Sequence, residues 1–110
     1  MDVLVDWQNI PWDNPGGEPR PGCRSKTCER DGQKIRLAEF SEGFVEDDWC
    51  MEGHLLYVLA GESNLRLRVG GEAVRLRPGV TGILLAGEAH AHRPEPAAGE
   101  CVQILLFEQP

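Results

Sequence analysis

Short apolar segments, each ended by a glycine or proline turn, constrain the fold of this chain more than any other feature. They lie at residues 34–40, 54–60, 65–69, 73–77, 81–86 and 100–108. Along several of them apolar and charged residues alternate, which is the two-residue period of a β-strand. We find no segment with the 3.6-residue apolar period of an amphipathic helix. The pattern therefore predicts an all-β fold, either a sandwich or a barrel.

The clearest single element is a hairpin over residues 65–77. Leucine and valine alternate with arginine on both sides of Gly70-Gly71, which supplies the turn. Residues 54–60 are apolar at nearly every position, so we expect a strand that is buried on both faces. A turn beginning at Gly61 is expected to end that strand.

The N-terminal third of the chain has a different composition. Residues 3–5 form a short apolar run, which we interpret as an edge strand, and residues 11–22 hold four prolines and three glycines. That content excludes a helix interior or a central strand. So long a loop is either a lid or partner contact, or an arm that covers apolar surface. We divide the chain into an N-terminal strand and arm (1–33) and a barrel (34–110), within one domain.

Composition limits the partners and the compartment. The 110 residues carry 18 acidic and 11 basic side chains, a net charge of −7, which repels a phosphate backbone and argues against nucleic-acid binding. No apolar run approaches the ~20 residues that span a bilayer, so we expect no membrane association. The N-terminus lacks the basic start and apolar core of a signal peptide. We therefore expect a cytoplasmic protein whose four cysteines are reduced.

Candidate metal ligands occur at two places in the chain. Asp48 and Cys50 precede the strand at 54–60 and His54 begins it, and their even spacing puts them on one face of an extended chain. His90 and His92 follow a second strand and a glycine turn, and share a face in the same way. Each has an ordinary alternative, namely a core histidine, a buried free thiol or a turn carboxylate.

The donor types in these clusters indicate which ion they would bind. Thiolate and imidazole suit zinc, with iron, manganese and nickel as the alternatives, whereas magnesium and calcium prefer oxygen ligands. A site with three protein ligands leaves one position for water or substrate, and thus for Lewis-acid chemistry or a bound hydroxide. His92 has a second interpretation as a general base. We find no nucleophile elbow and no phosphate-binding loop.

The first cluster resembles the first motif of the cupin superfamily. Gly61 corresponds to the glycine that closes this motif, and His54 stands where the family usually has a glutamate. Asp48 and Cys50 then stand where the family has a pair of histidines. The segment WCMEGHLLYVLAGE is similar to a subgroup of short cupins of unassigned activity.

The second cluster resembles the second cupin motif. His90 matches the histidine of that motif, which follows Gly79 and a turn at residues 85–87, where Leu85 replaces the usual proline. The resemblance implies a double-stranded β-helix, the jelly-roll barrel of the cupins, with a small-molecule ligand inside it. It also implies a homodimer, because small cupins often pair.

The superfamily includes dioxygenases, isomerases, sugar epimerases, storage proteins and sensor domains, so the fold alone does not select a function. Three hypotheses follow. In the first, the chain is a metal-binding cupin that binds or transforms a small molecule inside the barrel. In the second, it is a non-enzymatic sensor or binding module with a degenerate metal site. In the third, it is a mainly structural or partner-binding protein, whose proline-rich arm and apolar final strand form a homodimer. Whether the chain is an enzyme is left open by its sequence.

Overall fold

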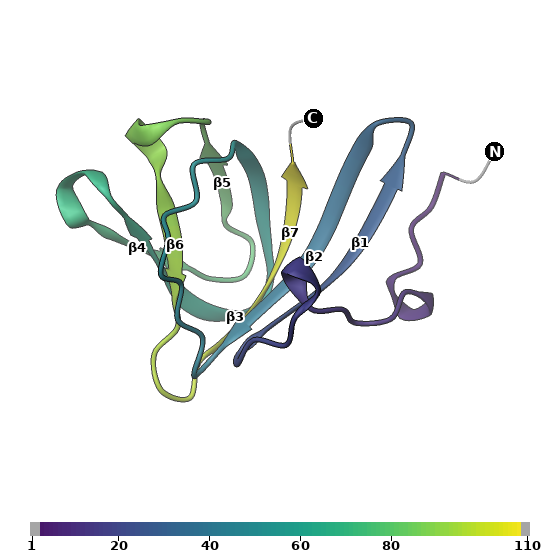
Figure 1. Cartoon of the computed structure of the whole chain (residues 1–110), viewed down its shortest axis with the longest axis horizontal. Helices are drawn as coiled ribbons and strands as arrows, with labels where there is room; N and C mark the ends of the chain where they lie inside the picture. Colours follow the sequence, from purple (N-terminus) through teal and green to yellow (C-terminus); the bar gives the residue numbers. More distant parts are fainter. Residues whose placement is uncertain (1–2, 109–110) are drawn as a thin grey trace.

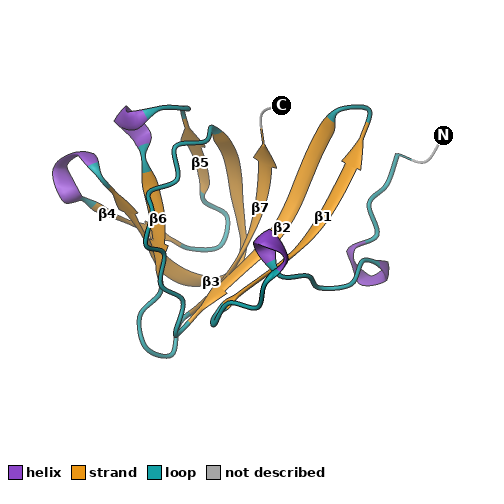
Figure 2. Cartoon of the chain, viewed as in Figure 1, coloured by secondary structure: helices purple, strands orange, loops and turns teal. Residues whose placement is uncertain are grey.

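The computed structural model describes residues 3–108, and strands make up nearly all of its regular structure (Figure 2). The strands, in chain order, are β1 (Cys23–Arg30), β2 (Gln33–Ser41), β3 (His54–Leu67), β4 (Ala73–Leu76), β5 (Thr81–Leu84), β6 (His92–Glu95) and β7 (Cys101–Glu108). Short turns of 3-10 helix form η1 (Trp7–Asn9), η2 (Pro15–Gly17), η3 (Val69–Gly71) and η4 (Glu88–His90). Among residues 3–108 no helix is long and apolar enough to cross a bilayer. The all-β prediction is confirmed.

β3 organises the sheet, because four of the other strands pair with it. Its first half lies between β7 and β5, so that Leu55 faces Phe107 on one side and Ile83 on the other. Its second half lies in the same way between β4 and β6. β2 pairs with the far side of β7, and β1 pairs with β2. Since β3 belongs to both groups of strands, the sheet curls around on itself (Figure 1).

At Gly61, shortly before β3 changes partners, its backbone passes very close to that of β7. Gly61 has a φ of +75°, and a Cβ atom there would lie 1.8 Å from the carbonyl oxygen of Cys101. Both the backbone angle and the close approach therefore require glycine. The turn predicted at this position is wrong, because β3 pairs with β7 as far as Glu62 and continues as a strand to Leu67.

The inner face of the curled sheet holds the hydrophobic core. The buried cluster consists of Ala38, Leu56, Val58, Leu65, Leu76, Val102, Ile104 and Leu106. Over residues 54–59 of β3 burial alternates, so that Leu56 is 3% exposed whereas its neighbour Tyr57 is 41% exposed. The prediction that residues 54–60 are buried on both faces is therefore wrong. Only the inner face is covered within the described chain, as in a sheet with one face toward the core.

β1 has no counterpart among the predicted strands. Its sequence, CRSKTCER, lacks apolar alternation, yet all eight of its residues pair with β2. A tight turn at Asp31-Gly32 joins the two strands, so β1 forms because its backbone pairs with the neighbouring β2. The hairpin predicted over residues 65–77 is confirmed, with η3 as its turn and Leu65 opposite Val74.

The proline-rich arm follows the free edge of β1. The backbones of Asp13 and Ser25 exchange two hydrogen bonds of 2.7 and 2.9 Å, and the Arg24 guanidinium lies 4.0 Å from the centre of the Trp12 ring. Residues 3–5, predicted as an edge strand, form no strand. The boundary that we expected between the arm and the barrel, after residue 33, falls at the start of β2. Residues 1–2 and 109–110 lie outside the described chain.

We expect Gly61→Ala to destabilise the fold far more than Gly79→Ala. Both glycines have positive φ, but a Cβ at position 79 would meet nothing within 4 Å. Gly79→Ala should thus cost only the backbone strain, about 1–2 kcal/mol. Gly61→Ala adds a collision with β7, for a total of about 3 kcal/mol or more. Denaturant unfolding measures both, and equal losses would contradict the role given to the close approach.

Candidate metal site

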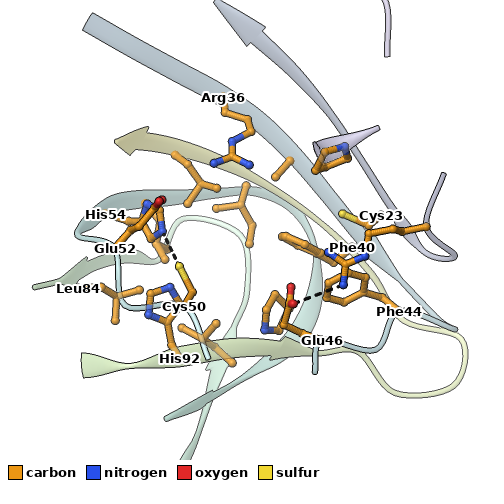
Figure 3. Close-up of a pocket in the computed structure, with 18 residues that line it drawn as sticks. Cys23, Arg36, Phe40, Phe44, Glu46, Cys50, Glu52, His54, Leu84 and His92 are labelled. Atoms are coloured by element: carbon orange, nitrogen blue, oxygen red, sulfur yellow. Dashed lines mark hydrogen bonds and ion pairs between the residues drawn. The ribbon is translucent and has the colours of Figure 1, made fainter. Parts of the chain in front are cut away.

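A pocket of about 270 Å³ opens on the inner face of the sheet, beside the core. Much of its wall is apolar, contributed by Ala38, Phe40, Phe44, Leu56, Leu65, Leu84, Ile104 and Leu106. Its polar lining consists of Arg20, Cys23, Arg36, Glu46, Cys50, Glu52, His54 and His92, all of which except Arg20 are labelled in Figure 3. An apolar cavity with a few convergent polar groups is typical of a small-molecule site.

Three potential metal ligands converge in one wall of this pocket. One donor atom from each of Cys50, His54 and His92 lies within 4.8 Å of the others. His54 begins β3 and His92 begins β6, whereas Cys50 belongs to the preceding loop. Two backbone hydrogen bonds, of 2.8 and 3.0 Å, tie that loop to β6 between Cys50 and His92. This bridge directs the thiol toward the two rings (Figure 3).

The imidazole of His92 is fixed in one tautomer. Its Nδ1 lies 2.9 Å from the carbonyl oxygen of His90. A carbonyl oxygen can only accept, so Nδ1 carries the proton and donates it. In the neutral ring the lone pair is then on Nε2, which is the arrangement found when histidine binds a metal. His92 is only 5% exposed, so the ring is held within the protein.

Cys50 and His54 are coupled electrostatically. The Cys50 Sγ lies 3.4 Å from His54 Nε2, and this hydrogen bond lowers the pKa of the Cys50 thiol, whereas partial burial opposes the shift. A lower pKa favours the thiolate, the form that binds metals. The rings of His54 and His92 meet edge to face, with centroids 5.3 Å apart. His54 Nδ1 is buried without a hydrogen-bond partner in residues 3–108.

These distances fit a small divalent ion. Ligand atoms at 2.0–2.3 Å from a tetrahedral centre are roughly 3.3–3.8 Å apart, and the Cys50–His54 separation of 3.4 Å is in that range. The whole group lies within 4.8 Å, so a closure of about 1.5 Å or less would complete three corners of a tetrahedron. The soft sulfur and the two imidazoles form a donor set that zinc and other late divalent ions prefer.

Two predicted ligands lie outside this group. His90 is half-buried in η4, and its Nδ1 accepts a 2.9 Å hydrogen bond from the backbone N–H of Leu85. Asp48 is exposed to solvent. The structure thus brings Cys50 and His54 together with His92 and not with His90. The reason is local, because η4 coils the chain at His90 and the extended strand begins only at His92.

Some pocket residues were not among the sequence candidates. Arg36 shares the inner face of β2 with Ala38 and Phe40, because alternate residues of a strand point the same way. A charged residue at the same parity as apolar inward residues can be recognised in the sequence, so Arg36 could have been found there. Other polar lining groups carry no such signal. The ion pair between Arg20 and Glu46, 3.4 Å long, joins two irregular segments that only the tertiary structure brings together.

We expect Cys50 to be alkylated at lower pH than Cys101 in metal-free protein. The hydrogen bond from His54 lowers the pKa of Cys50, whereas burial raises that of Cys101. The thiolate of Cys50 therefore forms first as the pH rises. Iodoacetamide labelling across a pH series, followed by peptide mass spectrometry, gives both profiles. His54→Ala should move the Cys50 profile toward that of Cys101, and a Cys101 thiol that reacts at lower pH than Cys50 would contradict this assignment.

No protein-family model matches the sequence, and the comparison with curated proteins finds no match. Solved structures do match. The polyketide cyclase RemF from Streptomyces resistomycificus matches over 98% of this chain and 79% of its own, with a TM-score of 0.78 and 19% identity. A sugar phosphate isomerase from a cupin superfamily, from Silicibacter pomeroyi, matches over 97% of this chain and 75% of its own, with a TM-score of 0.75 and 12% identity.

A third similar structure is Fe(II)-HppE with the alternative substrate (S)-1-HPP. It matches over 98% of this chain and 60% of its own, with a TM-score of 0.70 and 11% identity. At such identities the likeness is one of fold. It agrees with the curled antiparallel sheet described above and with the jelly-roll barrel that the two motifs imply. The chain therefore has the fold of the cupin superfamily.

Proposed function

We propose that this domain binds a divalent metal ion through Cys50, His54 and His92, and binds or transforms a small molecule in the adjoining pocket. The observation that carries the proposal is the convergence of a thiol and two imidazoles on the wall of one cavity. Zinc is our first choice because sulfur and nitrogen donors suit it, with iron, manganese and nickel as alternatives. A cytoplasmic location belongs to the proposal, since a thiolate ligand persists in a reducing compartment.

The chain's own residues prepare the site for such an ion. The His90 carbonyl holds the His92 ring with its Nε2 lone pair available, and His54 favours the thiolate of Cys50. When bound, the ion would supply Lewis-acid chemistry or a bound hydroxide. Apolar side chains such as Leu56 and Ile104 exclude water from the pocket wall, which strengthens polar contacts made there.

The similar structures support a small-molecule role. Their names describe a polyketide cyclase, a sugar phosphate isomerase and Fe(II)-HppE with a substrate. The alternative is a non-enzymatic sensor or binding module that uses the same pocket. The enzyme and the non-enzymatic module can be distinguished by the coordination of the bound ion. An enzyme requires a coordination position that exchanges water or substrate, whereas a purely structural ion has four protein ligands.

We expect Cys50→Ser, His54→Ala and His92→Ala each to weaken zinc binding by at least about 100-fold, because each removes one of three ligands. Competition with a chromogenic chelator measures the affinity, and elemental analysis gives the metal content. Asp48→Asn and His90→Ala serve as matched controls, since both retain the three donors and the backbone carbonyl of residue 90. Equal, negligible metal in wild type and all variants would end the proposal.

We further propose that the chain forms a homodimer through the outer face of the sheet. This outer apolar face consists of Leu55, Tyr57, Leu59, Ile83 and Phe107, each at least 41% exposed. Phe107, Leu55 and Ile83 lie in one row across β7, β3 and β5. A contiguous exposed apolar surface is typical of a protein–protein interface. Each copy carries a net charge of −7, so two copies repel one another. This repulsion is weakest when the copies meet through a face that carries no charge.

Ile83→Glu is expected to yield a monomer, because it would place a charge within the apolar contact, and Ile83 is 70% exposed in the single chain. Val69→Glu is the control, since Val69 is also exposed, at 62%, but lies in η3, away from the outer apolar face. Sedimentation velocity distinguishes the two states. A monomeric wild type at working concentration would refute the dimer.

A further inference from the structure

Arg36 places a cation in the pocket, on a different wall from the Cys50–His54–His92 cluster (Figure 3). It lies on the inner face of β2, opposite Leu106 of β7, which in turn lies opposite Leu56 of β3. Strands are about 4.8 Å apart and rise about 3.4 Å per residue, so the Cα atoms of Arg36 and His54 are roughly 12 Å apart along the sheet. Side chains from both positions reach a ligand held between them.

Within the described chain, Arg36 shares its acidic partner with a second cation. Its Nη2 forms an ion pair with Oε1 of Glu108, but Lys34 Nζ also binds this carboxylate, 3.3 Å from Oε2. Within residues 3–108 two cations therefore share this one carboxylate, and the charge of Lys34, which is 42% exposed, is screened by solvent. The Arg36 side chain is only 24% exposed, and its Nε is buried without a hydrogen-bond partner in the described chain. A partly desolvated charge of this kind is stabilised when an anion binds beside it.

The nearby acidic groups do not neutralise this charge. Glu46 is paired with Arg20 at 3.4 Å. Glu52 also lines the pocket, but it is exposed to solvent, where its charge is screened. Leu106 and Leu56, which continue the row of Arg36 across β7 and β3, give the wall between Arg36 and His54 apolar side chains. The volume of about 270 Å³ restricts the occupant to a compact molecule.

We propose that the pocket binds a small carboxylate, or a similar oxyanion, attached to a compact apolar body. The Arg36 guanidinium binds the anionic group, the apolar wall covers the body, and the far end of the molecule faces the Cys50–His54–His92 cluster. Only this last contact rests on the proposed metal site. The anion subsite is a property of Arg36 and its surroundings, and it is present with or without the ion.

The test compares two probes of the same shape, phenylacetate and its neutral amide, phenylacetamide. Dissociation constants are measured by NMR titration for metal-free and zinc-loaded protein. We expect metal-free wild type to bind the acid about ten-fold more tightly than the amide. The double variant Arg36→Met, Glu108→Gln removes the ion pair without leaving an unpaired carboxylate, and should bind both probes equally.

The matched control is the double variant Arg24→Met, Glu39→Gln. It removes an ion pair between β1 and β2, with a 2.8 Å contact between the two side chains, and this ion pair lies outside the pocket. This control should keep the ten-fold preference, and Glu108→Gln alone should keep or increase it. Equal binding of acid and amide by wild type, or a preference that survives in the Arg36 variant, would overturn the proposal. If metal-free protein prefers the acid but zinc is not retained, the metal site fails and the anion subsite stands.

Discussion

The close approach of β3 to β7 at Gly61 is the constraint on which the rest of the structure depends. A straight strand of fourteen residues would be roughly 44 Å long between its first and last Cα atoms. His54 begins β3, and His92 pairs with Leu67 at its other end, yet the two histidine rings are 5.3 Å apart. Only a strongly curled β3 achieves this. The curl requires a backbone without a Cβ where the strand passes close to β7, just before it leaves that strand. The meeting of His54 with His92, at opposite ends of β3, therefore depends on glycine at position 61.

The strand pattern explains why much of the fold was predictable. Alternating residues around Gly70-Gly71 define a hairpin by themselves, because the turn and the two faces are local properties. β1 was not predictable in this way, since its pairing comes from a neighbouring strand and not from its own apolar pattern. The exposed outer face of β3 was also missed. Leu55 and Tyr57 look like core residues in a sequence, which does not indicate which layers cover them.

The candidate site was predictable only in part, for a similar reason. Cys50 and His54 belong to one local segment, and their spacing already suggested a common face. The choice between His90 and His92 depended on where the extended chain resumes after η4, a matter of one or two residues that fixes the direction of each side chain. The hydrogen bonds between Cys50 and His92 join segments forty residues apart, and no local pattern encodes them.

The sheet thus divides its tasks between two faces. Inner residues build the core and the pocket, whereas outer residues present apolar surface that the single chain leaves uncovered. Arg36 is a charged residue beside the inward apolar residues of β2, and its ion pair with Glu108 allows a charge to remain there.

The bridge between Cys50 and His92 also bears on how such a domain can change over evolution. The ligands stand at the beginnings of two strands and in the loop before one of them, outside the buried cluster that holds the sheet together. Side chains at this rim can be exchanged without rebuilding the interior. A lineage could therefore alter or lose its chemistry by a few substitutions while the scaffold stays intact, which is one physical reason why a single architecture serves so many unrelated activities.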